Sequence, residues 1–144
     1  LETTSAALSA AETGHLVLAT LHTQSAAQTI ERIVDIYPGE QQQYVLSMLS
    51  NALRAVVSQT LLPKLGGGMV PAVEIMLCTA AVRNCIRENR IHEITNVIET
   101  SRAEGMCTLD DSLRALVLNG LADGEKAIAK SNSPDKLRRD LGLA

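Results

Sequence analysis

The stretch AAETGHLVLATLHT, residues 10–23, decides how the rest of the chain is organised. Its first residues close a helix of small side chains over residues 2–12. Residues 16–21 then form an apolar run that is followed directly by His22 and Thr23. Such a run is typical of a strand buried on both faces of a parallel sheet, and ligands bind beyond the carboxyl ends of such strands. The pattern therefore predicts a buried strand with a functional pair at its end.

The composition indicates a folded protein of one domain with one core. The chain has 144 residues, 46% of them hydrophobic, and a mean hydropathy of +0.10. A net charge of −3, a pI near 5.6 and the absence of Phe and Trp argue against nucleic-acid binding. No run reaches the roughly 20 apolar residues of a membrane span, so we expect no membrane insertion. The three cysteines, Cys78, Cys85 and Cys107, contain no C-x-x-C pair and are expected to be buried free thiols.

Charge is distributed unevenly along the chain. Residues 1–72 hold three basic and five acidic side chains, whereas residues 73–144 hold ten and eleven. A free surface so poor in charge would expose apolar patches that monomeric proteins usually avoid. We therefore expect the first half to pack against further sequence or against another subunit.

Helical spacing predicts two helices after the apolar run. Ser25 is a suitable N-cap for the first of them, which Pro38 and Gly39 end. The second is expected over residues 40–58, on an apolar stripe made of Val45, Met48, Leu49, Ala52, Leu53 and Val56.

A hairpin and a series of short helices are expected next. Residues 60–65 and 69–77 are predicted to be strands joined by three glycines, which form a turn and not a phosphate-binding loop. Thr108 with Asp111 is typical of a capping box, and Ser133 precedes a proline at a first helical position. Short charged helices are expected over 80–88, 91–99, 109–119, 124–130 and 135–141.

The histidines do not suggest a metal site. On a strand His15 and His22 would point to opposite faces, since they are seven residues apart, and His92 belongs to another element. On the residues alone, His22 has an ordinary alternative, a histidine satisfied by the backbone at a strand end.

Several pieces of the chain, in order, resemble the PilT-type pilus retraction ATPases of the hexameric secretion ATPase superfamily. The TLHT of residues 20–23 is similar to their His box, and AVRNCIRE resembles the AIRNLIRE box of that subgroup. Together the matching pieces run through nearly the whole chain: ETGHLVLATLHT (12–23), VSQTLLPKLGGG (57–68), AVEIML (72–77), AVRNCIRE (81–88) and GMCTLDDSL (105–113).

The resemblance implies an α/β fold: the C-terminal part of a RecA-like P-loop ATPase domain over residues 1–78, then a small α-helical bundle over residues 79–144. The Walker A and Walker B portions would lie upstream of Leu1, so this chain alone is expected neither to bind nor to hydrolyse ATP. The parent would use ATP and Mg²⁺. In the family His22 would sit near the γ-phosphate as a sensor, with Thr23 helping to hold it.

The resemblance also implies partners and a cellular location. The parent would be a homo-hexamer that drives type IV pilus retraction and twitching motility. It would dock on pilus platform proteins and be cytoplasmic, peripheral to the bacterial inner membrane.

The AVRNCIRE segment would be a box required for retraction and not for hydrolysis. Its alternative reading is an ordinary amphipathic helix, with three apolar side chains inward and three charged ones toward solvent. The box comprises Ala81, Val82, Arg83, Asn84, Cys85, Ile86, Arg87 and Glu88; Val82, Cys85 and Ile86 are the residues expected inward, and Arg83, Arg87 and Glu88 those expected outward.

Two other functions remain open on the sequence alone. The first is a non-catalytic helical interaction module that kept the family sequence without the motor. The second is an unrelated hydrolase that uses His22 with a Ser or Cys nucleophile, although the chain has no G-x-S-x-G elbow.

Overall fold

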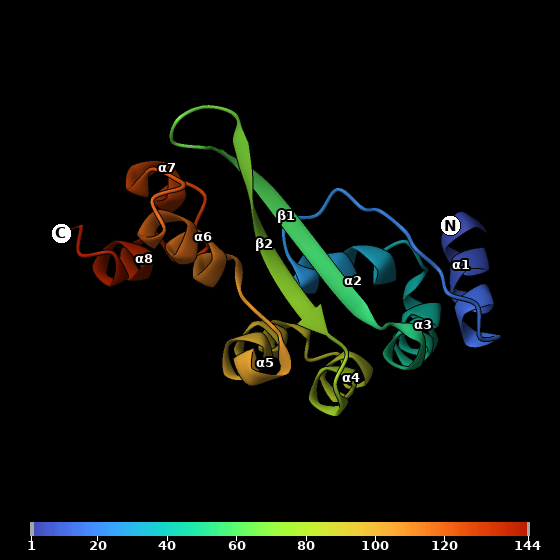
Figure 1. Ribbon diagram of the computed structural model, residues 1–144. Coiled ribbons are helices and arrows are strands. Elements are labelled where there is room, and N and C mark those ends of the chain that lie inside the picture. The colour runs from blue at the N-terminus through green and yellow to red at the C-terminus, as the bar shows by residue number, and fades with distance from the viewer. Residues whose placement is uncertain (1, 144) are drawn as a thin grey trace.

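The computed structural model describes residues 2–143, so Leu1 and Ala144 lie outside the described part. A two-stranded antiparallel hairpin, β1 (Ala55–Pro63) and β2 (Met69–Leu77), runs diagonally through the middle of the molecule with helices around it (Figure 1). The first helix of the chain and the last, labelled α1 and α8, lie at opposite ends of the molecule (Figure 1). The fold is α/β, as the sequence predicts.

Three helices precede the hairpin: α1 (Glu2–Glu12), α2 (Ala26–Val34) and α3 (Gly39–Ala52). Gly14 follows α1 with a φ of +95°, a conformation that suits glycine and ends the helix. Ser25 caps α2, as predicted, because its hydroxyl accepts a hydrogen bond from the third backbone N–H of the helix at 3.2 Å.

The hairpin has the expected turn and a long, unbroken register. Pairing runs from Ala55 opposite Leu77 to Pro63 opposite Met69. Gly66, Gly67 and Gly68 all have positive φ, which explains why three glycines occupy the turn. One face of the hairpin is covered by helices and carries the buried side chains Ser58, Leu62, Ala72, Glu74 and Met76.

Short helices follow the hairpin, close to the predicted ranges. The capping box at Thr108 and Asp111 is confirmed, and Pro134 occupies the first turn of the last helix. Ser133 stands at the cap position of that helix, but its side chain makes no capping hydrogen bond. The elements are α4 (Ala80–Arg87), η1 (Ile91–Glu93), α5 (Ile94–Thr100), η2 (Arg102–Glu104), α6 (Leu109–Leu118), α7 (Gly124–Ile128) and α8 (Pro134–Asp140).

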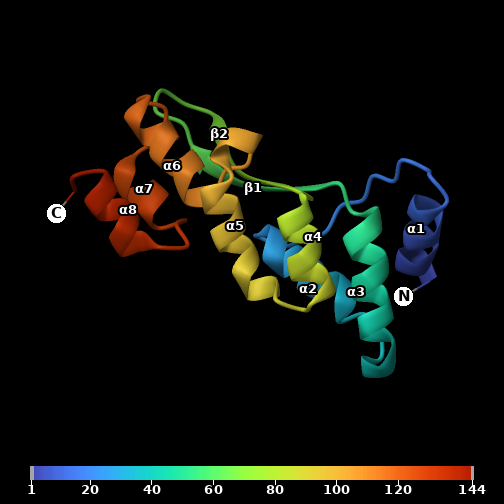
Figure 2. The ribbon, with the colours of Figure 1, turned by 90° about the horizontal axis from the view of Figure 1, so that it is seen from below.

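Buried apolar side chains form two clusters and not the single core expected. The first is built from α1 to α5 with the end of β2 that contains Met76, and the second from α6 to α8 with Leu62 and Ala72 of the hairpin. Figure 2 shows the same division, with α2 to α5 beneath one end of the hairpin and α6 to α8 at the other. The hairpin therefore belongs to both clusters and joins them.

The prediction of a buried strand at residues 16–21 is wrong. This segment is extended but joins no sheet, and Leu16 and Leu18 are 83% and 88% exposed. A parallel strand needs neighbours on its edges, and within residues 2–143 the sheet contains only β1 and β2, which pair with each other. The exposed leucines agree with the expectation that this half packs against something else.

The predicted end of the third helix at Ser58 is also wrong. The helix ends at Ala52, Leu53 turns extended with a ψ of 134°, and Val56 lies in β1. The apolar stripe predicts too long a helix because Leu53 and Val56 also pack against the first cluster, although from an extended backbone. Two consecutive valines favour a strand over a helix, which explains the change at this point.

Candidate functional site

The His22–Thr23 pair lies at the end of the extended segment, three residues before α2 begins. The His22 side chain is exposed, and no other described residue forms a hydrogen bond or an ion pair with it. Thr23 is half-buried, and its hydroxyl lies 2.7 Å from that of Thr29 in α2. Because the Thr29 hydroxyl donates to the Ser25 carbonyl at 2.8 Å, Thr23 is the donor to Thr29. Thr23 is thus fastened to the first turn of α2, and the exposed His22 directly precedes it.

A buried carboxylate stands at the start of the same helix. Glu74 on β2 is only 3% exposed, and its Oε1 accepts a hydrogen bond from the Ala26 N–H at 2.8 Å. Burial raises the pKa of Glu74, and the nearby charge of Asp110 raises it further. Backbone N–H groups of Ala26 and Leu109 act in the opposite direction, because they stabilise the ionised form. The carboxylate therefore faces the first residues of both α2 and α6.

The AVRNCIRE segment, which is the predicted retraction box, forms most of α4 and its C-cap. Val82, Cys85 and Ile86 are buried in the first cluster, as predicted, whereas Arg87 and Glu88 are exposed. The remaining members Ala81 and Asn84 are exposed as well.

Arg83 corrects the prediction that all the charged side chains of the box face solvent. It is half-buried, and its Nε donates to the Cys78 carbonyl at 3.0 Å. Its Nη1 donates to the Asn51 carbonyl at 3.3 Å, near the end of α3. The guanidinium reaches these carbonyls because α4 packs beside α3, a tertiary contact that helical spacing does not reveal.

The cysteines are free thiols, as expected. Cys78 and Cys85 are buried, and Cys107 is half-buried. Burial raises the pKa of Cys78 to about 11, although the positive charges of Arg83 and Arg54 act to lower it. A thiol with so high a pKa is a poor nucleophile at neutral pH, which does not favour a hydrolase that uses it.

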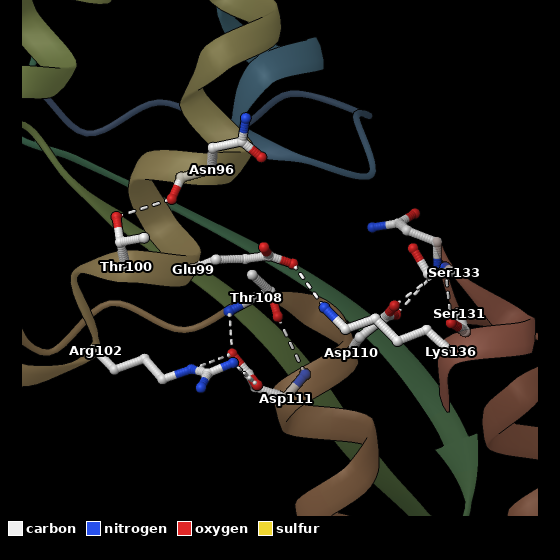
Figure 3. Close-up of polar contacts among 11 residues, drawn as sticks. Asn96, Glu99, Thr100, Arg102, Thr108, Asp110, Asp111, Ser131, Ser133 and Lys136 are labelled. Atoms are coloured by element: carbon white, nitrogen blue, oxygen red, sulfur yellow. Dashed lines mark hydrogen bonds and ion pairs between the residues drawn. The ribbon is translucent and has the colours of Figure 1, made fainter. Parts of the chain in front are cut away.

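A second polar cluster joins α5, α6 and α8 around a cleft of about 380 Å³ (Figure 3). Arg102 donates to both carboxylate oxygens of Asp111, at 3.0 and 2.7 Å. Burial alone would raise the pKa of Asp111, but hydrogen bonds from Thr108 and Arg102 together hold it below its ordinary value. Lys136 bridges to Glu99 at 3.2 Å. These paired charges fasten the helices to one another.

The structure does not bring the two predicted sites together. His22 precedes α2, whereas the box lies on α4, which packs against α3, α5 and η1. Within residues 2–143 no three His, Cys, Asp or Glu side chains gather as a metal site would require.

Sequence reasoning missed Glu74 as a site residue. The signal was present, because a single acidic residue interrupts the otherwise apolar strand MVPAVEIML. A charged side chain in such a run is either at an exposed position or is buried with hydrogen-bond partners. Only the packing of α2 and α6 decides between these outcomes.

Comparison with known proteins identifies the class. The family described as Type II/IV secretion system protein matches residues 1–67. The chain is 52% identical to the type IV pilus retraction ATPase PilT of Pseudomonas aeruginosa. The aligned region has 135 residues and covers 94% of this chain. It is 48% identical to a twitching motility protein of Neisseria gonorrhoeae, again over 94% of this chain. The chain is therefore a homologue of the retraction ATPases over nearly its whole length, and its residues 1–67 match the secretion-system family.

The fold agrees with this assignment. A crystal structure of the pilus retraction motor PilT with bound ADP superposes with a TM-score of 0.86 over 96% of this chain, at 45% identity. The chain spans 39% of the length of the Pseudomonas relative, 37% of the Neisseria relative and 39% of the crystallised motor.

Proposed function

We propose that this chain is part of a hexameric ATPase that retracts type IV pili and so drives twitching motility. The observation that carries the proposal is the similarity to retraction ATPases, which extends over 94% of the chain and beyond the residues 1–67 matched by the family. In this proposal residues 1–78 are the C-terminal part of a RecA-like nucleotide domain. Residues 79–144 are a helical C-terminal domain that carries the retraction box, consistent with the absence of strands after β2 in the described part.

ATP with Mg²⁺ is the proposed cofactor of the whole ATPase. The chain has no Walker A string, so the loop that cradles the phosphates is supplied by other sequence. His22 fits the edge of such a site, since its exposed imidazole is able to hydrogen-bond a phosphate oxygen. When bound, Mg²⁺·ATP supplies the transferable phosphoryl group and the neutralising charge. Thr23 would keep the imidazole oriented through Thr29.

The proposed setting is the cytoplasmic face of the bacterial inner membrane, on pilus platform proteins. None of the helices in the described part combines the length and the apolar character that crossing a bilayer requires. The exposed Arg87 and Glu88 of the box are the residues of α4 and its cap best suited to meet a partner.

A substitution of His22 tests the proposal, with His15 as the matched control. In the ATPase that contains this chain, His22→Ala should lower ATP turnover by roughly tenfold or more, because a hydrogen bond to the phosphates is lost. His15→Ala should leave turnover unchanged, since among residues 2–143 the His15 side chain bonds only to Thr13 and the Ala10 carbonyl. Turnover of the His22 variant at the wild-type rate would contradict the sensor role. Failure of nucleotide to drive hexamer assembly would favour a non-catalytic interaction module.

A further inference from the structure

Glu74 is the only acidic side chain buried among the described residues. It lies near the middle of β2, opposite Ser58, between the residues that pack in the first cluster and those that pack in the second. A buried carboxylate is costly unless hydrogen-bond donors surround it. Its position at the junction of two cores suggests a role beyond packing.

The N-terminal ends of two helices face this carboxylate. The first N–H of α2, on Ala26, donates a hydrogen bond to it at 2.8 Å. The first N–H of α6, on Leu109, is near enough to lower the pKa of Glu74, and Ser112 in the same helix accepts a hydrogen bond from the Val73 N–H of β2 at 3.0 Å. In each helix the third N–H is satisfied locally, by Ser25 in α2 and by Thr108 in α6. The two helices therefore have matching caps, and the first N–H of each lies beside the same side chain. Helix N-termini favour a negative charge at this position.

Each of these helices is fastened to a different part of the molecule. On one side, Thr23 bonds to Thr29 and so joins the His22 segment to α2. On the other side, Asp110 in the first turn of α6 accepts hydrogen bonds from the N–H groups of Asn132 and Ser133, each at 3.0 Å. These bonds tie α6 to the loop before α8 (Figure 3).

A polar cleft of about 410 Å³ lies between the two sides. Gln24, directly after Thr23, lines it, and so do Ser131 and Asn132 of the loop before α8. The two sides thus face each other across the cleft, which Leu109 at the start of α6 also lines. A displacement of either helix end is therefore expected to displace the other.

We infer that Glu74 is a positioning residue that couples the His22–Thr23 segment to the helical unit α6–α8. Movement of the segment shifts the N-terminus of α2 against the carboxylate, and α6 follows because its N-terminus faces the same carboxylate and Ser112 fastens the helix to the neighbouring Val73. The source of that movement, a change at the nucleotide phosphates, rests on the proposed function.

A double-mutant cycle on this chain tests the coupling without nucleotide. Amide hydrogen exchange at Ala26 and Leu109 is measured by NMR in Thr23→Val, Glu74→Gln and the double variant. Glu74→Gln should speed exchange at Ala26 by roughly tenfold or more, because a charged acceptor is lost, and should also speed exchange at Leu109. Thr23→Val should speed exchange at Leu109 about threefold while Glu74 is present, and leave it unchanged once Glu74 is replaced. An equal effect of Thr23→Val in both backgrounds, or none in either, overturns the inference.

Two further variants control for a general effect of replacing a glutamate and for a failure of Glu74→Gln to fold. Glu99→Gln is the matched control. Glu99 is half-buried and pairs with Lys136, far along the sequence from Glu74, so the substitution should not alter exchange at Ala26. Glu74→Asp retains the charge on a shorter side chain, and serves if Glu74→Gln fails to fold. It should lose protection at Ala26 or at Leu109, and protection unchanged at both sites overturns the inference.

The same readout in the ATPase that contains this chain separates the coupling from the proposed function. On addition of a non-hydrolysable ATP analogue, exchange should change at residues 22–24 and at the start of α6. With Glu74→Gln the change at α6 should fall at least about fivefold while that at residues 22–24 persists. An undiminished change at α6 overturns the coupling. No change at residues 22–24 in the wild type contradicts the proposed function, and the cycle on the chain then decides the coupling.

Discussion

Arg83 and Arg87 lie one helical turn apart in α4, yet the structure gives them different roles. Arg83 donates to the carbonyls of Cys78 and Asn51, and so clamps α4 to the turn after β2 and to the end of α3. The Arg87 side chain is exposed and forms no hydrogen bond or ion pair within the described part of the chain. We therefore predict that Arg83→Ala destabilises the fold and that Arg87→Ala does not.

The expected magnitude follows from the two hydrogen bonds. A bond that involves a charged group contributes about 1.5–3 kcal/mol when well formed. The Nη1 bond of Arg83 is long at 3.3 Å and the side chain is half-buried, so solvent replaces part of the loss. Arg83→Ala should then lower the free energy of unfolding by about 1–2 kcal/mol. Arg87→Ala should change it by less than about 0.5 kcal/mol.

Urea unfolding of this chain, followed by circular dichroism, measures both variants. The midpoint should fall for Arg83→Ala, with no change in the slope of free energy against urea. In the ATPase that contains the chain, Arg83→Ala should reduce ATP hydrolysis and retraction together, whereas Arg87→Ala should reduce retraction more than hydrolysis. Equal stability of the two variants would refute the clamp assigned to Arg83.

Four further predictions concern stability and reactivity. Leu113→Ala empties a fully buried position in the second cluster and should cost about 2–5 kcal/mol, whereas Leu118→Ala, at an exposed position, should cost less than about 0.5 kcal/mol; similar losses in urea unfolding would contradict the assignment of the cluster. The folded-state pKa of Asp111 lies below its ordinary value of 3.8, so its stabilising effect is present above that pH and lost as the pH falls through the lowered pKa. Asp111→Asn should therefore have a lower free energy of unfolding than the wild type at pH 7, and the difference should shrink in acid. A difference that stays constant with pH would contradict the role assigned to Asp111. The pKa of Glu74 is raised above 4.5, so stability should decline as the pH rises through that raised pKa, and Glu74→Gln should remove this part of the pH dependence in the same titration. Cys78, with a pKa of about 11, should react with iodoacetamide at pH 8 far more slowly in the folded chain than in urea, and equal rates would show that it is accessible.

Local signals predicted much of the fold. Ser25, the three glycines of the hairpin turn and the Thr108–Asp111 box each satisfy backbone groups within a few residues of themselves, so their effect is readable from neighbouring sequence. The apolar face of α4 was equally clear, because Val82 and Ile86 recur at helical spacing.

The errors arose where a residue depends on distant partners. The apolar run at residues 16–21 has the composition of a buried strand, but strand formation needs hydrogen-bonding neighbours that β1 and β2 do not provide. Arg83 was assigned to solvent because spacing along one helix says nothing of the α3 carbonyl beside it. Glu74 stands 48 residues from Ala26 in sequence, so no local pattern could join them.

The candidate site was predictable only through resemblance. From residue types alone, His22 had the simpler reading of a histidine at a strand end. The structure leaves its imidazole exposed and holds Thr23 against α2, which is the arrangement that the proposed sensor needs. Substitution of His22, and of Arg87 in the proposed retraction box, tests these two roles separately.

The most direct test of the proposed function is a chimera. This chain would replace the matching 39% of the Pseudomonas aeruginosa retraction ATPase, to which it is 52% identical, and twitching would be measured in cells that lack the native motor. We predict that the chimera restores twitching and that the same chimera with His22→Ala does not. A chimera that assembles into a hexamer but neither hydrolyses ATP nor restores twitching would contradict the proposal.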